Sequence, residues 1–472
     1  MSKIVKIVDY LKTTSINLMD NKTLNIKNIL IAMIYFFPIS FLFGNFFVNL
    51  NLILSSILFC IYFIYKKNIK FISIEVLLLI LFIITNIFFD LLLERENSIK
   101  TFGLIRFFIF GFLISYFFSN NILNVKKYEF YIACCVFIVC VDALFQNVFD
   151  FNLIGIKKEF NFTSGFFGDE KILGSYLSKI LIFILPLLLL RPNLKKIFLL
   201  LLVLFVILST TERMGLFTYL VSITFFFLFT GKNFQKQIIT ILTSILLILT
   251  MLFLIENLRN NYLIKTLHQY GFENLNKKII KTFNTKDNLI NCKKLELNQN
   301  ECAEKYYEDL MEELGLLKLN TKDGFKILSN NHIAHILVAL KIWNENKIVG
   351  IGVNNFRYFS YDKKYILEDK LYNSLKASTH PHNVYIQILV ETGILGFILF
   401  FTSIIIIIKK RIKYLFGSKS IKMSEVAFLI MLIIFLIPLP SGNIFGTSYG
   451  AFFWIFIFLN INFKNKKSKF LK

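Results

Sequence analysis

Residues 384–413 read VYIQILVETGILGFILFFTSIIIIIKKRIK. The part from 384 to 408 is almost entirely apolar, and a basic cluster follows it directly. About 20 such residues in a helix cross about 30 Å of hydrocarbon. Similar apolar blocks, separated by short charged stretches, recur along the 472 residues, of which 56% are hydrophobic. The pattern predicts an all-α membrane protein, a polytopic bundle of about 12 transmembrane helices.

The spans are expected at residues 29–45, 48–65, 71–93, 101–118, 128–149, 172–190, 195–210, 213–230, 237–256, 384–408, 424–440 and 445–463. With the N-terminus in the cytoplasm, about 26 basic residues lie in the inside segments and roughly three in the short outside loops. This bias predicts that both termini are cytoplasmic. The net charge of +23 is therefore mostly topological, with some attraction to anionic membrane lipid, and it does not indicate nucleic-acid binding.

The chain is expected to have three parts. Residues 1–256 form an N-terminal bundle of about nine spans, 257–383 a large loop outside the cytoplasm, and 384–472 about three further spans. The loop is expected to be partly helical, because residues 301–314 and 332–346 show helical spacing. In the second of these, the apolar residues at helical intervals are Ile333, Ile336, Leu337, Leu340 and Trp343. Cys292 and Cys302 could form a disulfide in an oxidising compartment or remain free thiols.

All five histidines of the chain fall in this loop: His268, His332, His335, His380 and His382. His382 is expected to open the span at 384–408, and Pro381 restrains His380. A neutral imidazole at the membrane surface can take a proton from a hydroxyl group. The alternative is a helix-start histidine bonded to the loop backbone. The pairs His380/His382 and His332/His335 match no zinc motif with a Glu or Cys partner, so neither a metal nor a cofactor is expected.

Arg213 lies in TERMG, residues 211–215, between two short apolar runs. A guanidinium there can bind phosphate through two parallel hydrogen bonds, or it can snorkel to the surface or pair with Glu212. For Arg106, one turn into its span, snorkelling is the favoured interpretation. Arg259 and Arg357 are loop residues that could line an anionic site or simply be solvated.

Glycines mark two further elements. Residues 349–357 (VGIGVNNFR) predict a tight turn whose spacing is not that of a phosphate loop. On a continuous helix, His382, Gly393 and Gly396 share one face, where small residues allow a neighbouring helix to approach closely.

These residues resemble a known family. His382-Asn383 followed by Glu391-Thr392-Gly393 and Gly396 is similar to the His-Asn…Glu-x-Gly-x-x-Gly motif of the O-antigen ligase and polymerase superfamily. The turn at 350–356 resembles its Gly-Val-Gly-x-x-Asn-Phe element, and 211–215 resembles its Ser/Thr-x-Arg-x-Gly element. The layout is also similar, with about twelve spans and a large periplasmic loop between the ninth and the tenth.

The resemblance implies a metal-independent, inverting glycosyltransferase of the bacterial inner membrane, with its active site facing the periplasm. An O-antigen ligase moves a glycan from undecaprenyl pyrophosphate to a lipid A–core hydroxyl; the alternative is a repeat-unit polymerase whose acceptor is another glycan. Arg213 maps onto the arginine that engages the pyrophosphate, and His382 onto the histidine that activates the acceptor. Ligase-type members often have a second arginine where this chain has His332. The candidate substrate-binding residues are Arg106, Arg259, His332, Arg357, His380 and Asn383.

A transporter of lipid-linked glycans is the competing class, and a non-enzymatic scaffold is a third. A transporter predicts internal repeats, interrupted helices and charges near the middle of the bilayer. The sequence shows no repeat, and most of its ionisable residues are expected at the outer surface. The sequence therefore favours the enzyme.

Overall fold

The computed structural model describes residues 23–66, 73–95, 98–158, 162–190, 193–230, 245–246, 248, 250, 255, 258–264, 328–417 and 423–461. Within these residues the fold is helical, with one isolated β-bridge between Phe151 and Lys157. In the described part of the chain, six helices are long and apolar enough to cross a membrane: Thr23–Phe43, Asn45–Lys66, Ile74–Leu92, Ile99–Ser119, Val125–Phe149 and Val384–Gly417. An all-helical membrane protein is thereby confirmed. Most of the expected ninth span, and with it the count of twelve, lies outside the described residues, as do residues 301–314, His268, Cys292 and Cys302.

The helices after the first span are α2 (Asn45–Lys66), α3 (Ile74–Leu92), α4 (Ile99–Phe102), α5 (Leu104–Ser119), α6 (Val125–Phe149), α7 (Leu173–Ile180), α8 (Leu185–Leu189), α9 (Leu194–Ser209), α10 (Arg213–Thr230), α17 (Asn330–Glu345), α18 (Phe356–Phe359), α19 (Lys370–Leu375), α20 (Val384–Gly417), α21 (Met423–Phe435) and α22 (Thr447–Leu459). Short 3-10 turns occur at Phe41–Phe43, Gly165–Phe167 and Leu181–Phe183, and a π-helix occurs at Arg259–Ile264.

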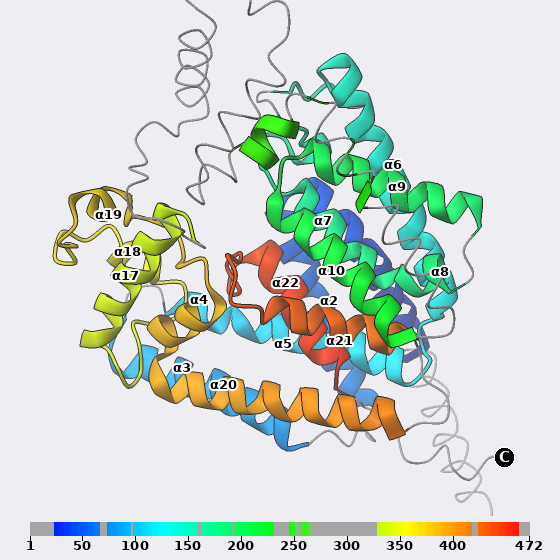
Figure 1. Cartoon of the computed structure of the whole chain (residues 1–472). Coiled ribbons are helices and arrows are strands. Elements are labelled where there is room, and N and C mark those ends of the chain that lie inside the picture. Colours follow the sequence, from blue (N-terminus) through cyan, green and yellow to red (C-terminus); the bar gives the residue numbers. More distant parts are fainter. Residues whose placement is uncertain are drawn as a thin grey trace, which may run out of the picture.

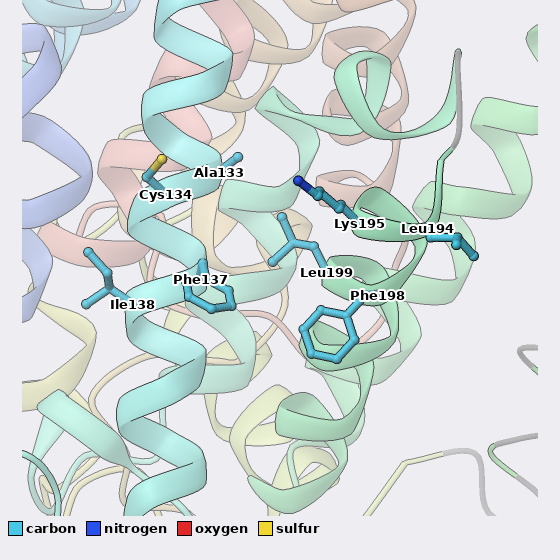
Figure 2. A pocket seen from close by; sticks show the side chains of 8 residues that line it. All are labelled: Ala133, Cys134, Phe137, Ile138, Leu194, Lys195, Phe198 and Leu199. Atoms are coloured by element: carbon cyan, nitrogen blue, oxygen red, sulfur yellow. The ribbon is translucent and has the colours of Figure 1, made fainter.

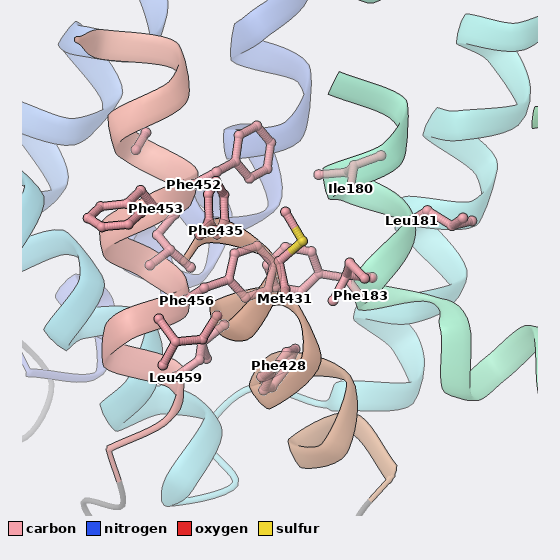
Figure 3. Close-up of a cluster of buried hydrophobic side chains, with 14 of the residues drawn as sticks. Ile180, Leu181, Phe183, Phe428, Met431, Phe435, Phe452, Phe453, Phe456 and Leu459 are labelled. Carbon is pink, nitrogen blue, oxygen red and sulfur yellow. The ribbon is translucent and has the colours of Figure 1, made fainter. Parts of the chain in front are cut away.

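The bundle is centred on α22, which packs against α5 and α21 (Figure 1). Aromatic side chains fill the space between α21, α22 and the turn that follows α7 (Figure 3). The ring centroids of Phe183 and Phe456 are 5.1 Å apart, and those of Phe435 and Phe453 are 5.4 Å apart. In a bilayer the hydrophobic effect does not drive helices together, so close packing has to hold them. Tilted and edge-on aromatic contacts of this kind contribute to that packing.

Helices α3 and α20 lie side by side along one edge of the bundle (Figure 1). They run antiparallel, because Lys410 near the end of α20 lies 2.5 Å from Glu75 in the first turn of α3. Arg411 pairs with Glu425 of α21 at 3.3 Å. The basic cluster at the end of α20 therefore ties three helices together.

An open apolar groove of about 720 Å³ is lined by residues of α6 and α9 (Figure 2). Phe137 and Ile138 project from α6, and Phe198 and Leu199 project from α9 (Figure 2). Lys195 is the charged residue of its lining.

The span expected at 172–190 is wrong as a single helix. The structure divides it into α7, a 3-10 turn at Leu181–Phe183, and α8. Pro186 stands at the start of α8, where its missing N–H and its ring end the preceding helical hydrogen-bond pattern. The interruption places the end of α7 inside the bundle.

The amphipathic helix expected at 332–346 is confirmed as α17. The face that it buries in the protein is not the one formed by the apolar residues at helical intervals. The structure buries Ala334, Val338, Ala339 and Ile342, whereas Leu337 is 39% exposed. The small alanines allow α17 to approach α20 closely, which the larger leucines on the adjacent face would prevent.

The glycine turn after α17 pairs with α20 through backbone hydrogen bonds. The N–H of Ile351 donates to Val390 O at 3.0 Å, and that of Gly352 donates to Glu391 O at 2.8 Å. Beyond Gly393, the N–H of Ile394 donates to Lys347 O at 2.9 Å.

Gly393 interrupts α20 with φ 65° and ψ −173°. The shared helical face expected for His382, Gly393 and Gly396 is therefore wrong. Gly393 breaks the helix, and His382 precedes α20 with a φ of 55°. The reason is that the glycine turn occupies the position that a regular helix would need.

Substituting Gly393 with alanine should destabilise the protein strongly. The added Cβ would lie 2.2 Å from Ile348 O, and the φ of 65° is unfavourable for any L side chain. We expect a loss of about 2 to 4 kcal/mol, seen as a lower unfolding temperature in detergent. The matched control is Gly417→Ala, where nothing lies within 4 Å of the new Cβ. An equal effect of the two substitutions would contradict the packing described here.

Candidate active site

Four histidines from two distant segments form one cluster. His332 and His335 lie on the first turns of α17, while His380 and His382 lie just before α20. The ring of His382 is 3.9 Å from that of His380, 5.3 Å from that of His332 and 5.2 Å from that of His335 (centroid distances). Two candidate substrate-binding residues, His332 and His380, thus lie next to the candidate base, His382. In the described part of the chain, no group of three or more His, Cys, Asp or Glu residues is arranged to hold a metal ion.

The loop between α21 and α22 holds the two histidines before α20. The N–H of Ser441 donates to His382 O at 2.9 Å, and His380 Nε2 donates to Ser441 O at 3.1 Å. The Ser378 hydroxyl donates to His380 O at 3.0 Å and lies 3.4 Å from His382 Nε2. Because that hydroxyl already donates to a carbonyl, we assign His382 Nε2 as the donor in the second contact, which leaves the lone pair of His382 on Nδ1.

Burial keeps these histidines neutral. It lowers the pKa of His382 to about 3, and the nearby histidines lower it further because a second positive charge would be repelled. Burial likewise lowers the pKa of His380 and His335 to about 4, and it lowers that of His332. A neutral imidazole has a lone pair available at pH 7, as a proton acceptor requires.

Asn383 and Glu391 hold the backbone of the site in place. Asn383 Oδ1 accepts from the N–H groups of Tyr385 and Ile386 at 3.0 and 3.2 Å and so caps α20. The fully buried Glu391 carboxylate accepts from the N–H groups of Asn354 at 3.0 Å and Phe356 at 3.4 Å. The substrate contact expected of Asn383 remains a prediction, whereas its capping role is observed.

A chain of amides connects the glycine turn, α20 and the loop at 436–446. Gln387 Nε2 donates to Asn443 Oδ1 at 2.7 Å, and Asn443 Nδ2 donates to Asn354 Oδ1 at 2.9 Å. At the other side of the turn, Arg95 pairs with Asp90 at 2.6 Å and donates to Gly350 O. The turn is thus bound to three other parts of the chain.

A cavity of about 470 Å³ lies beside the histidine cluster. His332, His380 and His382 form part of one wall, together with Ser441. Aromatic and aliphatic side chains form much of the remainder: Phe41, Phe167, Ile172, Tyr176, Met431, Ile434, Phe435, Ile437, Leu439, Tyr449 and Phe452. The cavity therefore combines a histidine wall with a large apolar surface.

Polar groups of α7 and of the turn before α10 also line the cavity: Lys171, Ser175, Lys179, Glu212 and Thr218. The Glu212 carboxylate accepts from the N–H groups of Gly174 at 2.8 Å and Ser175 at 2.9 Å. A carboxylate at the start of a helix is stabilised by the helix dipole. The element at 211–215 is thereby fixed to the first turn of α7.

Residues 198–401 match the family described as O-antigen ligase. This match supports the resemblance to the O-antigen ligase and polymerase superfamily. The matched residues include Arg213 and all four clustered histidines. No curated protein matches the chain. The family is one of glycosyltransferase-like membrane enzymes. The match and the apolar helices together indicate a membrane protein.

Two of the four candidate arginines, Arg213 and Arg357, lie near the cavity or the histidine cluster. Arg213 is the first residue of α10, between Glu212 and Met214, which line the cavity. Arg357, on α18, is close enough to His380 for its charge to lower the pKa of that imidazole, and its Nε atom is buried with no partner among the described residues.

Arg259 and Arg106 lie in other segments. Arg259 is buried in the π-helix. Arg106 lies over the ring of Phe107, 4.8 Å from its centroid. None of the four arginines is among the described residues that line the cavity, so their substrate contacts remain predictions.

Lys179, Arg95 and the loop at 436–446 were missed by the sequence analysis. A lysine in the middle of an apolar block is costly in a membrane, and that signal could have found Lys179. The loop has the sequence LIPLPSGNIFG, whose prolines and glycines could have marked a structured connection. Nothing in the sequence indicates that Arg95 meets Gly350, because the two are 255 residues apart.

Acidification should destabilise the protein through the clustered histidines. Their folded-state pKa values lie below the unfolded value of about 6.5, so the unfolded chain binds more protons as the pH falls below that value. Stability should thus be fully present above about pH 7, and by pH 5 each of the most buried histidines should cost about 1 to 2 kcal/mol. Unfolding temperatures in detergent at the two pH values measure this effect.

In His335→Gln the loss of stability between pH 7 and pH 5 should be smaller than in the wild type. Asn331→Gln, on the exposed side of the same helix, is the control and should lose as much as the wild type. A wild-type protein equally stable at both pH values would contradict the burial of neutral imidazoles.

Proposed function

We propose that the protein transfers a glycan from undecaprenyl pyrophosphate to a hydroxyl group of lipid A–core, as an O-antigen ligase does. The carrying observation is the cavity in which neutral His382 shares a wall with two further histidines beside a large apolar surface. The match to the family supports the reaction class. In this proposal both termini lie in the cytoplasm, and the site faces the periplasm of the inner membrane.

His382 is proposed to act as the general base. Its Nδ1 atom accepts the proton of the acceptor hydroxyl, whose oxygen forms a bond to the anomeric carbon of the donor sugar. The bond between that carbon and the pyrophosphate oxygen breaks, so the leaving group is undecaprenyl pyrophosphate and the anomeric configuration is inverted. The rings of His332 and His380 restrict the position of His382, which keeps the base aligned.

Cationic side chains are proposed to stabilise the leaving group. Charge develops on a pyrophosphate that is already anionic, and a preorganised guanidinium lowers the energy of that state. Arg213 is proposed for this role because Glu212 anchors its segment to α7 and because its neighbours line the cavity. Arg357, beside His380, is proposed as a second contact.

The apolar part of the cavity is proposed to hold the polyprenyl chain next to the pyrophosphate. Phe41, Phe435 and Phe452 present aromatic surfaces there. A polyprenyl chain gains little by moving from lipid to protein, so these contacts would position the donor more than they would increase its affinity.

Removing the base or the arginine should abolish most of the transfer. With purified protein, lipid-linked donor and acceptor, we expect His382→Ala to lose about 10²- to 10⁴-fold in rate and Arg213→Ala about 10²-fold or more. Lys195→Met, in the groove between α6 and α9, is the control and should transfer normally. The mechanism fails if both site variants join glycan to acceptor at the wild-type rate.

The same components, with the protein reconstituted in vesicles, distinguish an enzyme from a transporter. The interrupted span at α7 and α8 is a feature that transporters share. If the wild-type protein moves the donor across a vesicle membrane and forms no new glycosidic bond, the transporter is the correct class.

Lipopolysaccharide from a deletion strain distinguishes ligase from polymerase. For a ligase we expect core without attached O-chains, because the last transfer step is missing. For a polymerase the gel would show core that carries a single repeat unit. The second pattern would overturn the ligase assignment and leave the superfamily assignment intact.

A further inference from the structure

Lys179 is a buried cation that the proposed mechanism does not use. It lies in the last turns of α7, is 7% exposed and lines the cavity that contains His382. Its ammonium group donates to Ser175 O at 3.1 Å and to the Ser175 hydroxyl. It also lies over the ring of Tyr449, 4.9 Å from the centroid. The two hydrogen bonds to Ser175 use two of the three N–H groups of the ammonium.

Among the described residues, Lys179 contacts the neutral groups of Ser175 and Tyr449. The carboxylate that acts on it is that of Glu212, through space. That carboxylate is itself bound by the N–H groups of Gly174 and Ser175. A cation among apolar side chains costs free energy unless a counter-charge balances it. The cavity beside Lys179 has the space for an anionic ligand to supply that counter-charge.

Glu212 also controls where an anion can bind. The first N–H groups of a helix attract phosphate, but those of α7 are already occupied by this carboxylate. An anion entering the cavity is thereby directed away from the start of α7. Two lysines line the cavity here. Lys171 is exposed and donates to the Thr211 hydroxyl, whereas Lys179, further along the helix, is buried.

We propose that Lys179 binds a phosphate group of the lipid pyrophosphate donor, from the side of the cavity formed by α7. The proposal rests on the proposed function, because it names a further binding residue of the same site. The ligand class follows from the lining, which combines a cation with a large apolar surface and so fits an anionic head group attached to an isoprenoid chain. As a compact charge, an ammonium can bind phosphate without the planar geometry that an arginine requires.

The test measures binding of undecaprenyl pyrophosphate, without a glycan, to the full-length protein in detergent. We expect Lys179→Met to weaken this binding at least 10-fold and Lys179→Arg to restore most of it. Binding of undecaprenol, which has no phosphate, should be the same in all three proteins. Lys195→Met is the control for loss of a lysine elsewhere and should bind undecaprenyl pyrophosphate as the wild type does.

Stability separates a ligand-binding role from a structural one. Replacing a buried charge by an apolar side chain of similar size is often neutral or stabilising. We therefore expect Lys179→Met to unfold at the same temperature as the wild type or at a higher one. A lower unfolding temperature with unchanged binding would show that Lys179 only holds α7 against Tyr449.

The outcomes also distinguish this proposal from the proposed function. If Lys179→Met binds undecaprenyl pyrophosphate like the wild type while His382→Ala stops transfer, the role of Lys179 is refuted and the enzyme remains. If the wild-type protein neither binds undecaprenyl pyrophosphate nor transfers glycan, both proposals are refuted.

Discussion

The site depends on a contact between two pieces of backbone, the turn at Gly350 and the kink of α20 at Gly393. A Cβ on Gly350 would lie 2.5 Å from the carbonyl carbon of Glu391, and one on Gly393 would lie 2.2 Å from Ile348 O, so neither position tolerates a side chain. The Glu391 carboxylate strengthens this contact because it accepts hydrogen bonds from the N–H groups of Asn354 and Phe356 in the turn. Because α17 leads directly into this turn, the contact determines where the histidines of α17 lie.

The histidine cluster is a consequence of that arrangement. His332 and His335 meet His380 and His382 only because α17 lies across the start of α20. Burial then keeps the imidazoles neutral. Two other elements that line the cavity, α7 and the turn at Glu212, are joined by hydrogen bonds of their own. Two parts of the chain far apart in sequence thereby present a proton acceptor and a cation to one cavity.

Much of the helical framework could be predicted from the sequence, because apolar blocks long enough to span a bilayer have few alternatives to a helix. The turn at 349–357 and the helix α17 could also be predicted. The interruption after α7 and the buried face of α17 could not, because both depend on which neighbours the helices meet. For the same reason the kink at Gly393 and the position of His382 outside the helix were missed, since the sequence does not show that the glycine turn occupies that place. Lys179 was missed although a lone lysine within an apolar block is itself a signal of function.

We propose that the donor's pyrophosphate binds in the cavity lined by the histidine cluster and α7. In an electron cryo-microscopy structure of the wild-type protein with undecaprenyl pyrophosphate, we expect phosphate density inside this cavity, between His382 and Lys179. The isoprenoid chain should lie along Phe435 and Phe452. Phosphate density at another place, such as the groove between α6 and α9, with the cavity left empty, would contradict the proposal.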